Sequence, residues 1–118
     1  MRVLITGVTG FAGRHLAAHC VERGAEVHGA VRQGRSGAVP DGVRPHEVSL
    51  ADPQSVRELL DRVAPERVFH LAGSASVGQS FADALGTWEG NLGATLGVLE
   101  ALRSSGGGAR TLIVTSGE

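Results

Sequence analysis

The stretch Thr6-Gly7-Val8-Thr9-Gly10-Phe11-Ala12-Gly13 decides the fold, because it lies between an apolar run and a helical pattern. The run before it, Val3-Leu4-Ile5, is typical of a buried parallel strand. Residues 14–23 carry the apolar spacing of a helix. Three glycines at this junction allow a sharp turn and let a diphosphate approach the backbone, where the first N–H groups and the dipole of the helix favour an anion. The stretch therefore predicts a dinucleotide-binding turn.

Strand-like and helix-like segments alternate along the whole chain, which predicts an α/β domain with a parallel sheet covered by helices. Crossovers are right-handed and the two halves wind in opposite directions from the first strand, so the expected strand order is 3-2-1-4-5. Residues 32–45, rich in Gly and Pro, are expected to form a loop. We expect strands over residues 3–6, 26–31, 46–50, 67–71 and 110–115, and helices over residues 14–23, 53–64 and 84–104.

Composition narrows the class of protein. The 118 residues are enough for one domain with a core, but short for a two-domain enzyme. A net charge of −1 argues against a nucleic-acid partner or an anionic membrane surface. The apolar runs are too short to span a membrane. The single cysteine, Cys20, excludes an internal disulfide and fits a reducing cytosol, so we expect a cytoplasmic protein.

Four motifs stand in order on the expected elements, and they are Thr6-Gly7-x-x-Gly10-x-x-Gly13, His70-Leu71-Ala72-Gly73, Asn91-x-x-Ala94-Thr95 and Thr115-Ser116-Gly117-Glu118. Together they resemble the extended short-chain dehydrogenase/reductases, the family of nucleotide-sugar epimerases, dehydratases and reductases. Residues 4–11, 27–29 and 86–91 are most similar to its members that act on GDP-sugars, the GDP-mannose 4,6-dehydratases and GDP-4-keto-6-deoxy-mannose reductases.

The resemblance implies a Rossmann-like fold, a nucleotide-sugar substrate and hydride transfer at a sugar carbon. It also implies that Ser116 hydrogen-bonds the reacting sugar oxygen and that Glu118 matches a glutamate with an acid/base role. Where the family often has an aspartate that contacts adenine, this chain has Ser49. The residues expected to contact the cofactor are Gly7, Thr9, Gly10, Phe11, Ala12, Gly13, Leu50, Leu71, Ala72 and Gly73.

The end of the second strand indicates which cofactor binds. An acid there selects the ribose 2′-hydroxyl of NAD, whereas arginines pair with the 2′-phosphate of NADP. Here the strand is followed by Arg32 and Arg35, with Ser36 next, and no acid stands among them. We predict NADP(H) over NAD(H), because two guanidiniums can hold a phosphate. The alternative is that both arginines are solvated loop charges.

The chain contains no tyrosine and no lysine, since all 11 basic residues are arginine. The family's Tyr-x-x-x-Lys pair would lie beyond the fifth strand, so we expect residues 1–118 to form an incomplete NAD(P)-binding domain without full catalytic machinery. We expect a homo-oligomer or a complementing C-terminal polypeptide. The alternative is a non-catalytic dinucleotide sensor or one subunit of a split enzyme, and Ser116 and Glu118 would then be a solvated terminus.

The histidines suggest a metal site only weakly. His15 and His19 have a spacing that can ligate zinc, but they fall on the polar face of the first helix without a third ligand in evident reach. We therefore predict no metal site. His70 is interpreted as a strand-end residue near the cofactor rather than a base, and Cys20 as part of the core.

Overall fold

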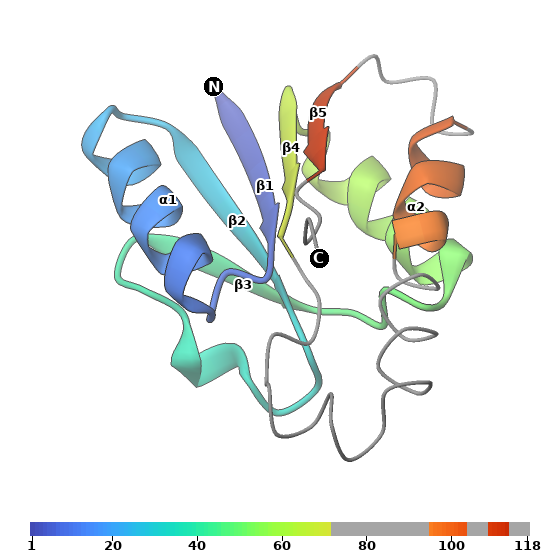
Figure 1. Cartoon of the computed structure of the whole chain (residues 1–118), viewed down its shortest axis with the longest axis horizontal. Coiled ribbons are helices and arrows are strands. Elements are labelled where there is room, and N and C mark those ends of the chain that lie inside the picture. The colour runs from blue at the N-terminus through green and yellow to red at the C-terminus, as the bar shows by residue number, and fades with distance from the viewer. Residues whose placement is uncertain (72–94, 104–108, 114–118) are drawn as a thin grey trace, which may run out of the picture.

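The computed structural model of the chain describes residues 1–71, 95–103 and 109–113 (Figure 1). Predictions that fall on residues 72–94, 104–108 and 114–118 lie outside this part. The elements are β1 (Arg2–Thr6), α1 (Phe11–Glu22), β2 (Glu26–Val31), the 3₁₀ turn η1 (Ser36–Ala38), β3 (Val43–Glu47), α2 (Pro53–Val63), β4 (Arg67–His70) and β5 (Arg110–Ile113). Residues 95–103 are also helical.

The strands form one parallel sheet in the order β3-β2-β1-β4-β5, which confirms the predicted order. The β1 strand lies at the centre, and Val3, Leu4 and Ile5 are buried. Helix α1 covers one face of the sheet, while α2 and residues 95–103 cover the other (Figure 1). The carboxyl ends of all the strands meet at one edge of the sheet, because the strands are parallel.

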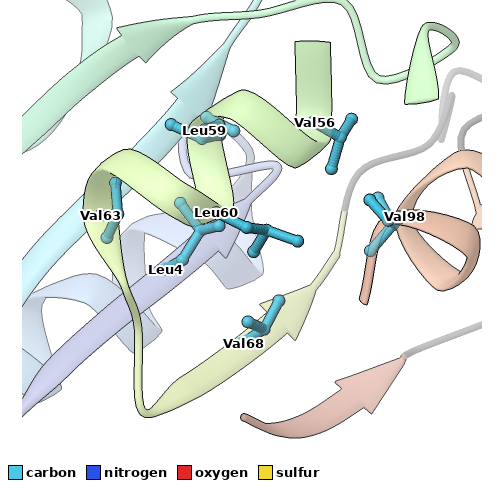
Figure 2. Close-up of a cluster of buried hydrophobic side chains, with 9 residues drawn as sticks. Leu4, Val56, Leu59, Leu60, Val63, Val68 and Val98 are labelled. Carbon is cyan, nitrogen blue, oxygen red and sulfur yellow. The ribbon is translucent and has the colours of Figure 1, made fainter. Parts of the chain in front are cut away.

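Two apolar clusters hold the layers together, because side chains of a strand alternate between the two faces. The α1-side cluster contains Val3, Ile5, Val8, Ala17, Val27, Val31 and Val43. Cys20 packs against this cluster, as predicted from its place on the apolar face of the helix. The α2-side cluster contains Leu4, Ala30, Val56, Leu59, Leu60, Val63, Val68, Val98 and Ala101, most of them drawn in Figure 2.

Helix α2 begins and ends as predicted. The Asp52 side chain caps it by accepting hydrogen bonds from the Gln54 N–H (3.1 Å) and the Ser55 hydroxyl (2.8 Å). These hydrogen bonds hold the pKa of Asp52 below its usual value. At the other end Ala64 adopts a left-handed conformation (φ 48°), and Pro65 follows. None of the described helices is long and apolar enough to cross a membrane.

Helix α1 begins at Phe11, three residues before the predicted start. Gly10 is its N-cap, so Phe11, Ala12 and Gly13 form its first turn. The prediction was wrong because the apolar spacing of this helix begins only beyond Gly13, which hides its first turn from a periodicity argument. The third glycine of the motif, Gly13, therefore lies inside the helix, in its first turn.

Strand β3 was also predicted wrongly, since it spans Val43–Glu47 and not residues 46–50. Pro45 suggested a loop, but β3 is the edge strand of the sheet, where a residue without an N–H group is tolerated. The shift places Glu47 at the carboxyl end of β3, opposite Val31 at the end of β2. A carboxylate therefore lies at the carboxyl ends of the strands, where the glycine turn also lies.

Candidate dinucleotide-binding site

The turn after β1 excludes a side chain at Gly13 and needs a left-handed backbone at Gly7. Gly7 has a φ of 71°, which favours glycine, and its carbonyl oxygen accepts a hydrogen bond from the Gly10 N–H (3.1 Å). A Cβ atom on Gly13 would lie 2.0 Å from the Gly7 oxygen and 2.8 Å from the Val8 Cα. The first and third glycines are therefore required by the path of the chain itself.

The N-terminus of α1 lies beside this turn, and its first N–H groups have no partner within the helix. The N-cap Gly10 offers no side-chain acceptor, and the first intrahelical bond runs from the Arg14 N–H to the Gly10 oxygen (2.9 Å). The N–H groups of Phe11, Ala12 and Gly13 thus have no acceptor within the helix. The first turn contains no acidic residue. This arrangement fits a diphosphate, because donors and the helix dipole point to the same place.

The ends of β1 and β4 are tied together next to the turn. The Thr6 hydroxyl oxygen accepts from the Leu71 N–H (3.0 Å) and is hydrogen-bonded to His70 Nδ1 (2.8 Å). His70 Nε2 is hydrogen-bonded to the Thr95 hydroxyl (3.1 Å), so the imidazole joins both strands to the helix at residues 95–103. Burial lowers the pKa of His70, which favours the neutral ring. His70 is thus buried, and it lies at the end of β4 as predicted.

A carboxylate from β3 reaches the connection after β2, and the sequence-based argument, which considered only the residues next to the second strand, did not include it. The Glu47 Oε1 atom accepts hydrogen bonds from the Gly34 N–H and from the Ser36 hydroxyl, both at 3.0 Å. Arg32 and Arg35 are exposed in the same connection. The arginines predicted to hold a 2′-phosphate therefore share their loop with a carboxylate that comes from β3.

Arg14 links the two loops at this edge. Its Nε donates to the Thr9 carbonyl oxygen (3.0 Å) in the glycine turn, and its Nη2 donates to the Ala38 carbonyl oxygen (2.8 Å) in η1. The guanidinium thus sets the distance between the predicted diphosphate-binding turn and the connection after β2. The helical pattern correctly placed Arg14 on the polar face, but a face assignment says nothing about a partner 24 residues away.

The remaining predicted residues divide into two groups. Leu50 is half-buried and packs against the α2-side cluster, where a Cβ on Gly97 would lie 2.5 Å from its carbonyl oxygen. Leu71 is half-buried and follows β4 directly. Four predicted residues lie outside the described part of the chain, and they are Ala72, Gly73, Ser116 and Glu118.

A second polar cluster lies on β2 and β3. His28 Nε2 is hydrogen-bonded to Glu26 (3.0 Å), and His28 Nδ1 to His46 Nε2 (2.8 Å). Glu26 also pairs with Arg2 and Arg44. Over residues 1–71, 95–103 and 109–113 no three His, Cys, Asp or Glu side chains gather in a way that could hold a metal ion. The cluster joins β1, β2 and β3 electrostatically, and it belongs to the fold rather than to the candidate dinucleotide site.

Sequence reasoning thus missed two residues at this edge, Arg14 and Glu47. Glu47 carried one usable signal, because moving the third strand back to Val43 would have placed it at the strand end. Arg14 carried none, since its second acceptor is a backbone carbonyl in a segment without a regular pattern.

A glycine turn between a central parallel strand and a helix, at the point where the strand order reverses, defines a dinucleotide-binding fold of the Rossmann class. A family model confirms this class and narrows it: residues 3–118 match the NAD dependent epimerase/dehydratase family, and the chain belongs to that family.

Individual relatives agree with this assignment. A UDP-glucose 4-epimerase of Streptomyces lividans is 34% identical over 98% of this chain and 35% of its own length. A GDP-6-deoxy-D-mannose reductase of Pseudomonas aeruginosa is 33% identical over 99% of this chain and 34% of its own length. The crystal structure of the Thermus thermophilus UDP-glucose 4-epimerase in complex with NAD is 38% identical, with a TM-score of 0.78, over 90% of this chain and 35% of that one. The chain thus spans about a third of the length of these relatives.

Proposed function

We propose that the chain is the NADP(H)-binding portion of a nucleotide-sugar oxidoreductase, a reductase or 4,6-dehydratase that acts on a GDP-hexose or another NDP-hexose. The observation that carries this proposal is the turn after β1, where a Cβ on Gly13 would meet the Gly7 oxygen at 2.0 Å and the helix N-terminus has no side-chain cap. Family membership and the GDP-6-deoxy-D-mannose reductase among the relatives support it.

In this proposal the N–H groups of Phe11, Ala12 and Gly13 bind the cofactor diphosphate. The exposed guanidiniums of Arg32 and Arg35 would pair with the 2′-phosphate, and Ser36 would add a hydroxyl donor. Residues Thr9 and Gly10 would shape the turn. Leu50, Leu71, Ala72 and Gly73 would also contact the cofactor, as the resemblance implies.

When bound, the nicotinamide cofactor supplies hydride transfer. We propose that Ser116 hydrogen-bonds the reacting sugar oxygen and that Glu118 holds or gives a proton, as the resemblance implies. The chain's 118 residues contain no tyrosine or lysine. A phenolic acid and an ammonium group must then come from a further segment or from a complementing polypeptide.

The missing tyrosine and lysine also favour a second candidate, a dinucleotide-binding protein without chemistry that acts as a sensor or as one part of a split enzyme. The intact mass of the protein from its native source separates the two. A mass near 12.1 kDa supports the second candidate, whereas a mass two to three times larger supports the first.

The cofactor preference is tested by titrating the native protein with NADPH and NADH and following nicotinamide fluorescence. We expect NADPH to bind more tightly, and Arg32→Ala and Arg35→Ala each to weaken NADPH binding about tenfold, since a charge-assisted hydrogen bond contributes about 1.5–3 kcal/mol. The matched control is Arg110→Ala. Arg110 is exposed and begins β5, so it lies at the amino end of the strand, away from the candidate site. Equal affinities for both cofactors, or arginine variants that match the control, would refute the NADP(H) preference.

A further inference from the structure

We propose that Glu47 is a specificity-determining residue that opposes binding of a 2′-phosphate, by occupying the hydrogen-bond donors of the connection after β2. The inference rests on the proposed function, because it concerns the place given there to the adenosine ribose. Glu47 belongs to β3, so a rule that infers cofactor preference from the residues at the end of β2 would not select it.

Glu47 already acts as an anion bound in this connection. Its Oε1 atom accepts from the Gly34 N–H and from the Ser36 hydroxyl, each at 3.0 Å. Gly34 has a φ of 83°, and such left-handed turns aim N–H groups into anion-binding concavities. The connection therefore offers two convergent donors, and a carboxylate of the same chain takes both.

Strand pairing holds Glu47 in this place. Val31 and Glu47 are register partners in the parallel β2–β3 pair, and the Val48 N–H donates to the Val31 carbonyl oxygen (3.0 Å). The backbone on both sides of Glu47 is thus fixed next to the residue that precedes Arg32. Only the side chain can move when a ligand arrives.

A ribose 2′-substituent at these donors meets the carboxylate in one of two ways. A 2′-hydroxyl can donate a hydrogen bond to the carboxylate, which is a favourable charge-assisted contact. A 2′-phosphate must displace the carboxylate and then bind near a like charge. Arg32 and Arg35 attract the phosphate while Glu47 repels it, so the ratio of the two affinities depends on the balance between them.

The substitution Glu47→Gln tests this balance, because glutamine keeps an oxygen acceptor for Gly34 and Ser36 and removes the charge. The native protein is titrated by calorimetry with adenosine 2′,5′-bisphosphate and with AMP, two probes that differ by the 2′-phosphate and contain no nicotinamide. We expect Glu47→Gln to bind the bisphosphate about tenfold more tightly and AMP no more tightly than the unchanged protein does.

The matched control is Glu66→Gln, which removes an exposed carboxylate just before β4, at the opposite edge of the sheet. Glu47→Ala is a second variant, which removes both the charge and the acceptor. Like Glu47→Gln, it should bind the bisphosphate more tightly than the unchanged protein does and AMP no more tightly. Thermal melts of all variants confirm that they fold.

The outcomes separate this inference from the proposed cofactor. The deciding quantity is the ratio of the affinity for the bisphosphate to the affinity for AMP. If both Glu47 variants leave this ratio unchanged while Arg32→Ala weakens bisphosphate binding, the role of Glu47 is overturned and the NADP(H) proposal stands. A raised ratio in Glu47→Gln with no effect of either arginine supports the role of Glu47 and refutes the arginine-based preference.

Discussion

Two connections lie side by side at the carboxyl edge of the sheet, and they are built in opposite ways. The turn after β1 is shaped by missing side chains: Gly7 and Gly13 touch backbone to backbone within seven residues of sequence. The connection after β2 is shaped by side chains that reach it from elsewhere. Arg14 comes from α1 and Glu47 from β3, across 24 and 11–13 residues of sequence.

This difference determines how each connection should respond to substitution. At Gly13 an added methyl group would meet only backbone atoms of Gly7 and Val8, so the backbone must move. The second connection depends on exposed hydrogen bonds, each of which contributes little and can be replaced by water. We therefore expect abrupt losses at the first connection and graded losses at the second.

The largest effect is expected for Gly13→Ala. In an ordinary helix this change stabilises by up to about 1 kcal/mol, because alanine has the higher helix propensity. Here the new Cβ would lie 2.0 Å from the Gly7 carbonyl oxygen, so the turn and α1 must separate. We expect the free energy of unfolding in urea to fall by about 3 kcal/mol or more, together with loss of dinucleotide binding.

Gly37→Ala is the matched control, because a Cβ at this position in η1 meets no atom within 4 Å. It should change the free energy of unfolding by no more than about 0.5 kcal/mol. If Gly13→Ala and Gly37→Ala unfold at the same urea concentration, the glycine turn accommodates a Cβ at Gly13 by a small backbone shift. The expected difference between the two connections would then be wrong.

The same contrast explains how much could be predicted from sequence. The glycine turn and the Asp52 cap of α2 were predicted, because each depends on neighbouring residues. The strand order was predicted because the alternation of strands and helices and the handedness of crossovers leave few arrangements. The register of β3 was not, since Pro45 is tolerated only because this strand lies at the sheet edge. The contacts of Arg14 and Glu47 depend on that register and on the packing of α1, which no local pattern contains.

Arg14→Ala should have the intermediate effect. It removes two hydrogen bonds of an exposed side chain, to the Thr9 and Ala38 carbonyl oxygens, and those acceptors remain accessible to water. We expect a loss of about 1 kcal/mol in the free energy of unfolding. Because the guanidinium joins the two connections, we also expect the dissociation constant of NADPH to rise about fivefold.

Arg23→Ala removes an exposed arginine at the other end of α1 and serves as the control. Arg14→Lys sharpens the test, because an ammonium group cannot reproduce the planar geometry that reaches two separated carbonyls. Arg14→Ala and Arg23→Ala variants with equal NADPH affinity would show that the two connections are positioned independently.

The smallest effect concerns pH and the strand that carries Glu47. Burial, followed by the charges of His28, Arg62 and Arg44, lowers the pKa of His46 below its ordinary value. An unfolded histidine titrates near about 6.5, so below that pH the unfolded chain takes up the proton more readily than the folded chain. The contribution of His46 to the free energy of unfolding is therefore complete above this pH. It declines as the pH falls below this value, and it levels off below the lowered pKa.

The hydrogen bonds supply the structural reason for this decline. The 2.8 Å bond between His28 Nδ1 and His46 Nε2 needs one nitrogen without a proton, while His28 Nε2 faces Glu26. Two protonated rings would place two donors against each other and weaken the β2–β3 pair, one residue before Glu47. Buried His70, whose pKa is also lowered, gives a decline of the same sign next to the glycine turn.

His46→Gln separates the two histidines. Between about pH 7.5 and pH 5.5, where Glu26 stays ionised with its pKa lowered chiefly by the His28 hydrogen bond, urea unfolding should show a smaller decline in this variant than in the unchanged chain. His19→Gln, on the exposed face of α1, should keep the full decline. If His46→Gln keeps it as well, the pH dependence arises at His70, and acid weakens the glycine-turn side of the edge instead of the strand pair that positions Glu47.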